Sequence, residues 1–86
     1  MEIRWGARDV AIGAGSGEEI TPDDNTDLSA STRGLYVGAS GDVTVIMERD
    51  TAAITFTALA AGVVHPLRVK RVLATGTTAT GIVGVY

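Results

Sequence analysis

Residues 67–86 read Leu67-Arg68-Val69-Lys70-Arg71-Val72-Leu73, then Ala74-Thr75-Gly76-Thr77-Thr78-Ala79-Thr80-Gly81, then Ile82-Val83-Gly84-Val85-Tyr86. Two β-branched, apolar runs flank a loop of glycine and threonine, which is the pattern of a strand, a turn and a returning strand. We therefore predict a β-hairpin at the centre of the fold. The final apolar run is expected to end inside a sheet, because a free apolar terminus gains little from disorder.

The composition of the whole chain also indicates β structure. Ala, Val, Thr and Gly dominate its 86 residues, whereas Trp, Tyr and Phe together make up only 5%. Small and β-branched side chains suit thin, two-sided sheets better than a helical core. No window shows helical spacing with caps. We predict one all-β domain, a small antiparallel β-sandwich or jelly-roll-like barrel of about six to seven short strands.

Several kinds of function are disfavoured by composition and charge. The chain has no Cys and a single His, which argues against disulfides, thiolate metal sites and imidazole clusters. A net charge of -3 argues against binding to nucleic acid. No apolar run approaches the ~20 residues of a membrane span, and the N-terminus lacks the apolar core of a signal peptide. We expect no cofactor, no metal and no membrane contact, and synthesis in the cytoplasm.

A glycine-rich linker is predicted to divide the chain into two parts. Residues 1–17 are predicted to form an N-terminal arm that ends in the linker Gly13-Ala14-Gly15-Ser16-Gly17, and residues 18–86 are predicted to form the β domain. A small domain without a disulfide or metal gains stability by self-association. The arm then has the reach to cross onto a neighbouring copy.

Three further strands are predicted inside the domain, over residues 33–39, 43–48 and 53–59. Ser40-Gly41-Asp42 is a tight-turn signal, so the first two are expected to pair as a hairpin. Arg49-Asp50-Thr51 predicts another turn, and residues 53–59 alternate with a period of two.

The strand after Pro66 departs from strict alternation. Leu67 and Val69 are expected to face inward, but Arg71 then falls on the same face. Either a β-bulge redirects the chain near Val72, or Arg71 lies where the sheet meets another surface.

Two local patterns contain residue types that are found in metal or catalytic sites. Asp23, Asn25 and Asp27 have the spacing of a calcium loop, but the required Gly and Glu positions are Leu28 and Gly34. A turn with local side-chain caps is the better interpretation. His65 lacks a nucleophile motif to serve, so catalysis is not expected. We predict no enzymatic activity.

Two groups of residues are candidates for contact with a partner protein. Basic side chains cluster on the strand after Pro66, where a solvated face and a partner surface are about equally good interpretations. The arm carries apolar side chains suited to burial against another copy. The interface candidates are Ile3, Trp5, Val10, Ile12, Arg68, Lys70 and Arg71.

The sequence also resembles a known family. The segments that carry the resemblance are Thr21-Pro22-Asp23-Asp24, Thr26-Asp27-Leu28, residues 32–38, Gly41-Asp42-Val43, residues 66–79 and residues 81–86. They are similar to the head spike base proteins of tailed phages, prophages and gene transfer agents. The similarity covers residues 20–86, and residues 66–79 are its most specific part.

This resemblance implies a non-enzymatic structural protein of the virion, made in the cytoplasm of a host bacterium. It implies an oligomeric ring of fivefold symmetry at a capsid vertex, where the ring would bind the major capsid protein and anchor a spike or fibre. A β-sandwich module for carbohydrate binding or adhesion is the alternative. It is prompted by the threonine-rich strands, although a lectin-like site would need more exposed aromatic residues.

Overall fold

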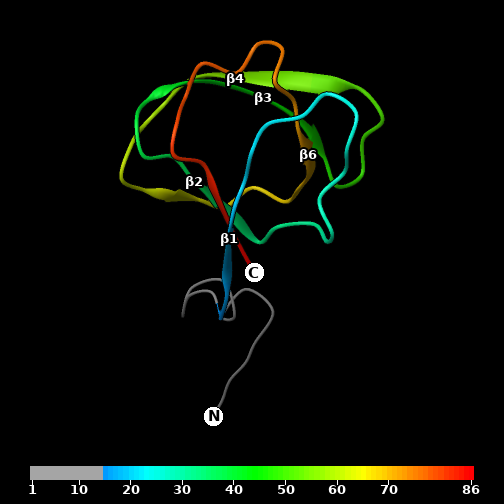
Figure 1. The fold of residues 1–86 in the computed structure, drawn as a ribbon, viewed down its shortest axis with the longest axis horizontal. Helices are drawn as coiled ribbons and strands as arrows, with labels where there is room; N and C mark the ends of the chain where they lie inside the picture. Colours follow the sequence, from blue (N-terminus) through cyan, green and yellow to red (C-terminus); the bar gives the residue numbers. More distant parts are fainter. Residues whose placement is uncertain (1–14) are drawn as a thin grey trace.

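The computed structural model describes residues 15–86, which form seven strands and no helix (Figure 1). The strands are β1 (Gly17–Glu19), β2 (Gly34–Tyr36), β3 (Gly41–Met47), β4 (Ala53–Leu59), β5 (Val64–His65), β6 (Val69–Val72) and β7 (Val83–Val85). Within this range no helix could therefore cross a membrane. The predicted division of the chain at residue 17 stays a prediction, although Gly17 itself begins β1 and pairs with Val85.

The strands form two antiparallel sheets, in the orders β1-β7-β2-β5 and β4-β3-β6. Apolar side chains from both sheets meet in one core, including Leu35 and Val37 from the first sheet region and Val43, Val45 and Val69 from the second. Each of these five side chains is fully buried. The predicted all-β fold is confirmed, with two sheets packed around a common core.

The predicted hairpin over residues 67–86 is wrong. β6 and β7 are both strands, but β6 pairs with β3 in one sheet whereas β7 pairs with β1 and β2 in the other. The Gly and Thr segment between them carries the chain from one sheet to the other. Sandwich cores are closed by crossings of this kind, which look the same in sequence as a hairpin turn.

The hairpin predicted around Ser40-Gly41-Asp42 is also wrong, for the same reason. β2 belongs to the four-stranded sheet and β3 to the three-stranded sheet, so the turn joins two sheets. The next turn, at residues 49–51, does join a true hairpin. β3 and β4 pair from Ile46 opposite Ala53 to Gly41 opposite Leu59, with a bulge near the far end.

The loop after β6 lies over β3 and is fixed there by threonine hydroxyls. The Thr77 hydroxyl accepts the N–H of Thr44 at 3.0 Å and donates to the carbonyl of Leu73 at 2.6 Å. Gly76 has φ +88°, and a Cβ there would lie 2.5 Å from the Thr44 hydroxyl oxygen. These close contacts bury Thr44 and use the loop's hydroxyls internally, which weakens the case for a sugar site on this face.

β6 contains the irregularity that its sequence predicted. Its register against β3 shifts where Ile46 pairs with Arg71 but Met47 pairs with Val69, so one residue is extra on β6. Val69 and Val72 are both buried. Of the two explanations that the sequence left open, the bulge is present, and the side chain of Arg71 also contacts a neighbouring segment.

Candidate assembly surfaces

One edge of the three-stranded sheet is covered by the chain itself. The segment between β1 and β2 runs along β6 and donates three backbone hydrogen bonds to it. These run from Asp23 N–H to Val72 C=O (2.8 Å), from Leu28 N–H to Lys70 C=O (2.8 Å) and from Thr32 N–H to Val69 C=O (3.1 Å). Covering an edge in this way satisfies groups that would otherwise attract another strand.

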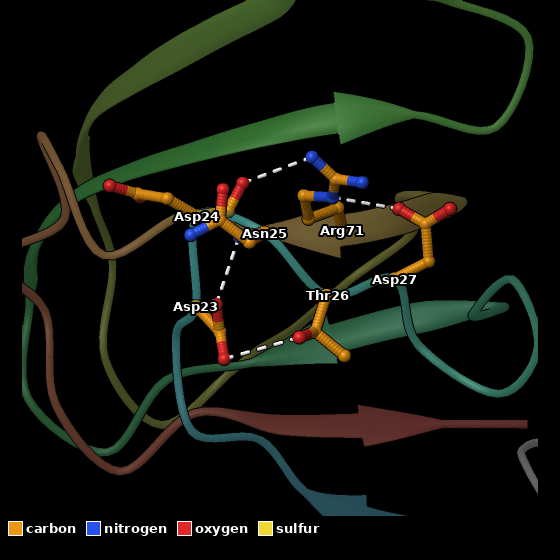
Figure 2. Close-up of polar contacts among 6 residues, drawn as sticks. All are labelled: Asp23, Asp24, Asn25, Thr26, Asp27 and Arg71. Atoms are coloured by element: carbon orange, nitrogen blue, oxygen red, sulfur yellow. Dashed lines mark hydrogen bonds and ion pairs between the residues drawn. The ribbon is translucent and has the colours of Figure 1, made fainter.

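Arg71 anchors this covering segment. Its Nε donates to Asp27 Oδ1 at 2.7 Å and its Nη1 donates to the carbonyl of Asp24 at 3.0 Å (Figure 2). Within the turn, Asp23 accepts the N–H of Asn25 at 2.9 Å and the hydroxyl of Thr26 at 3.3 Å. The interpretation of this segment as a turn with local caps is confirmed.

The same geometry opposes a calcium ion at this turn. The Arg71 guanidinium is a fixed cation, and it lies against the carboxylate that a metal would need. In the part of the chain that the structure describes, no group of three or more His, Asp or Glu side chains could hold a metal ion.

Asp24 ties the turn to the loop after β6. Its two carboxylate oxygens accept the hydroxyl of Thr75 at 2.6 Å and the N–H of Thr75 at 2.9 Å. These hydrogen bonds, led by the hydroxyl, lower the pKa of Asp24 below its ordinary value, with a smaller contribution from the charge of Arg71. Hydrogen bonds to the ionised form stabilise that form, so the lowered pKa links folding to pH.

We predict that this link is visible in acid. Because the pKa of Asp24 is lower in the folded state, the unfolded chain takes up a proton first as the pH falls below about 4. The stability that Asp24 contributes is therefore present above that pH and is lost as the pH falls further. Melting temperature measured across the acid range should show a shallower fall for Asp24→Asn than for the natural chain. Thr75→Ala, which removes the main cause of the lowered pKa, should flatten the profile in part. Identical acid profiles for all three proteins would contradict the assignment.

The structure separates the predicted interface residues. The side chain of Arg71 is hydrogen-bonded to the turn, and Lys70 is half-buried. Arg68 is exposed and lines a shallow depression together with Met47, Glu48 and Arg49. The backbone joins these elements, because Glu48 N–H donates to the carbonyl of Arg68 at 2.9 Å. Arg68 is thus the member of the basic group most available to a partner. Ile3, Trp5, Val10 and Ile12 lie outside the described residues.

A second surface was not predicted from the sequence. β4 and β5 are edge strands of the two different sheets, joined by a short turn in which Gly62 N–H donates to the carbonyl of Val37 at 3.0 Å. The imidazole Nε2 of His65 lies 2.9 Å from the carbonyl oxygen of Ala60 and holds the same turn, a structural position for this side chain. The end of β4 and the start of β5 are therefore close together in space.

We call this surface the open side, meaning the outer edges of β4 and β5 together with the side chains of Ile54, Val63 and Val64. Those three are the large hydrophobic residues exposed within residues 15–86, with 47%, 51% and 52% of their surface accessible. A sequence signal does exist, because residues 51–64 contain no charged side chain. This signal does not identify an exposed surface, because an uncharged, alternating stretch usually indicates a buried strand.

Comparisons with known proteins point to one class. No protein-family model matches the chain, and no curated protein matches it. Among solved structures, one described as the capsid of a native GTA particle computed with C5 symmetry contains a similar chain. The two chains are 44% identical, with a TM-score of 0.74, and the match covers 85% of this chain and 83% of that one.

Identity at this level over most of both chains shows homology as well as a shared fold. The protein is thus a relative of a component of a gene transfer agent capsid, and its class is that of phage-type structural proteins. The chain belongs to the family of that capsid protein.

Proposed function

We propose that the protein is a structural component of the virion of a tailed phage or gene transfer agent, serving as an oligomeric head spike base or capsid-vertex adaptor. The 44% identity to a chain of a GTA capsid carries this proposal. The residues that resemble head spike base proteins, above all 66–79, supply the finer role. In this role the protein acts by binding and has no catalytic function.

The partners follow from the position proposed. Copies of the chain form a ring, with five subunits where the ring lies on a fivefold vertex, and the ring joins the major capsid protein to a spike or fibre protein. The capsid of the relative was computed with C5 symmetry, which supports a ring of this order. The protein is made in the host bacterial cytoplasm and incorporated into the virion there.

The basic residues at the start of β6, Lys70 within the strand and Arg68 just before it, supply one proposed contact. Arg68 is exposed and Lys70, two residues further on, is half-buried, so both can face an acidic surface of the capsid. Arg71 supports this contact indirectly, by fixing the turn at residues 23–27. Ile3, Trp5, Val10 and Ile12 remain proposed contacts of the arm.

The test of this proposal is attachment to particles. Particles assembled without the protein are mixed with purified full-length chain, and bound protein is measured after sedimentation and located by electron microscopy. We expect saturable binding at the vertices. Arg68→Glu combined with Lys70→Glu should weaken binding, most strongly at low salt because exposed charges are screened at high salt.

Arg33→Glu is the control for a single charge reversal and is compared with Arg68→Glu alone, since Arg33 is exposed but precedes β2 in the other sheet. It should bind as the natural chain does. Protein that never sediments with particles, or that binds evenly over the capsid surface, would contradict a vertex role.

A further inference from the structure

The two edges of the three-stranded sheet differ in whether other parts of the chain cover them. On one side β6 is covered by the segment of residues 21–32, which donates three backbone hydrogen bonds to it. On the open side, no strand from residues 15–86 pairs with the outer edge of β4. Natural sheets protect a bare edge with charged residues or proline, and residues 51–64 contain neither. The residues of β4 are therefore typical of a strand that pairs with a further strand along its outer edge.

The groups that β4 offers can be identified from its partner strand. Thr44 directs its N–H to the Thr77 hydroxyl and its carbonyl to the N–H of Leu73, both on the side of β3 away from β4. Thr55 is opposite Thr44 in the register, and such pairs exchange no hydrogen bonds in an antiparallel ladder. The N–H and C=O of Thr55 therefore point outward, toward an additional strand.

The side chains of β4 define what kind of strand fits. Ile54 is opposite Val45 and Phe56 is opposite Val43, so both lie on the core-facing side of the sheet. Phe56 packs against the core in part, and Ile54 remains 47% exposed. A strand added beside them needs apolar, β-branched residues two apart on that side and no charge between them.

The chain contains such a segment outside the described residues. Val10-Ala11-Ile12 places two β-branched apolar side chains two residues apart, and residues 10–17 contain no charged side chain. We propose that the outer edge of β4 receives this N-terminal segment from a neighbouring copy of the chain, with Val10 and Ile12 beside Ile54 and Phe56. The inference rests on the self-association in the proposed function and specifies the contact that produces it.

The N-terminal segment must come from another copy, because it is too short to extend from Gly15 to β4 of its own chain. Gly15 is fixed beside β7, since its N–H donates to the carbonyl of Tyr86 at 2.8 Å, and β1 is the edge of its sheet opposite β5. Three strand spacings and one sheet spacing put β4 at least about 17 Å away. Ile12 is three residues from Gly15 and reaches only about 10 Å. The segment is therefore too short to pair with β4 of its own chain.

The same geometry suits a closed ring. In cyclic assemblies above the dimer, one surface of each subunit contacts a different surface of the next. Here the attachment point of the segment, Gly15, is hydrogen-bonded to Tyr86 next to β7, whereas β5 is at the other end of the strand order of that sheet. Repeating that contact from copy to copy uses both surfaces once per subunit.

The absence of cysteine allows a direct test by disulfide formation. Full-length Ile12→Cys and full-length Ile54→Cys are mixed in equal amounts, dissociated, reassembled and oxidised, and products are separated without reductant. We expect a linked dimer that contains one chain of each kind, in several-fold excess over the product from either variant alone. Val10→Cys covers the alternative register. Thr26→Cys, on the covered side, replaces Ile54→Cys in the control mixture and should give no excess.

A charge on the edge gives an independent measurement. Ile54→Lys should raise the dissociation constant for self-association by about ten-fold or more, because it buries an unpaired charge in the contact. Ala61→Lys, in the exposed turn beyond β4, adds the same charge away from the edge and should have little effect. Thermal melting of each variant at low concentration checks that the monomer fold is retained.

The outcomes separate this inference from the proposed function. An oligomer that persists in Ile54→Lys and gives no mixed disulfide would overturn the inference and leave the vertex role standing. A disulfide formed only within one chain, seen in an Ile12→Cys/Ile54→Cys double variant and absent from the mixture, would also overturn it. So would a natural chain that stays monomeric at high micromolar concentration, whereas the vertex role is judged by particle binding alone.

Discussion

Removal of residues 82–86 is expected to abolish cooperative unfolding. β7 lies between β1 and β2, so its loss leaves both without their shared neighbour. The deletion also removes Ile82, which is 2% exposed and whose burial is worth about 1.5–3 kcal/mol. A small domain with total stability on the order of 5–15 kcal/mol cannot lose that burial and two ladders together.

Differential scanning calorimetry and circular dichroism are the appropriate measurements. We expect a broad, low-enthalpy transition in the truncated chain, or no transition. Tyr86→Phe is the control, because it keeps β7 and removes only the hydrogen bond from the Tyr86 hydroxyl to Glu18. A truncated chain that melts as sharply and at the same temperature as the natural one would show that β7 is dispensable.

Thr32→Val is expected to destabilise the fold by about 2–4 kcal/mol, since it leaves two polar groups without partners. The Thr32 hydroxyl is fully buried, donates to the carbonyl of Leu67 at 2.8 Å and accepts the N–H of Val69 at 3.1 Å. Valine has nearly the same shape, so packing changes little. For a domain of this size the melting temperature should fall by roughly 10 °C or more.

Thr32→Ser distinguishes the contribution of the hydroxyl to stability from that of the methyl group. It keeps both hydrogen bonds and removes a methyl that lies close to Gly84, so its cost should be near 1 kcal/mol. Chemical denaturation of the three proteins measures the difference. Equal stability for the Val and Ser variants would mean that the hydroxyl does not hold the covering segment against β6.

Local features of the sequence accounted for the longer strands and for the turn of the true hairpin, but not for the short strands β1 and β5. Residues 53–59 alternate with a period of two and form β4 with those bounds, and the turn at residues 49–51 joins it to β3. The broken alternation at Arg71 was compatible with a bulge or with contact to another surface, and a bulge is present. Alternation, turns and bulges depend on residues that are close together in the sequence, and so they can be predicted from composition and spacing.

Surfaces were harder to predict than strands. Arg68, Lys70 and Arg71 are close together in the sequence. Only the fold brings Asp27 to 2.7 Å from Arg71, so that the Arg71 side chain binds the turn. The open side is uncharged in sequence, and that property alone fits a buried strand as well as an exposed edge. Which of the two applies depends on what packs beside β4.

The sequence by itself determined that this protein is all-β and that it resembles structural proteins of phage heads, and it left a bulge or a contact with another surface as the two explanations for Arg71. Only the tertiary structure decided which strands pair. Gly84 of β7 pairs with Glu18 and with Leu35, and Ser40-Gly41-Asp42 joins two sheets instead of closing a hairpin. The reason is that a turn residue fixes the local backbone, whereas strand pairing is chosen by burial of side chains distant in sequence.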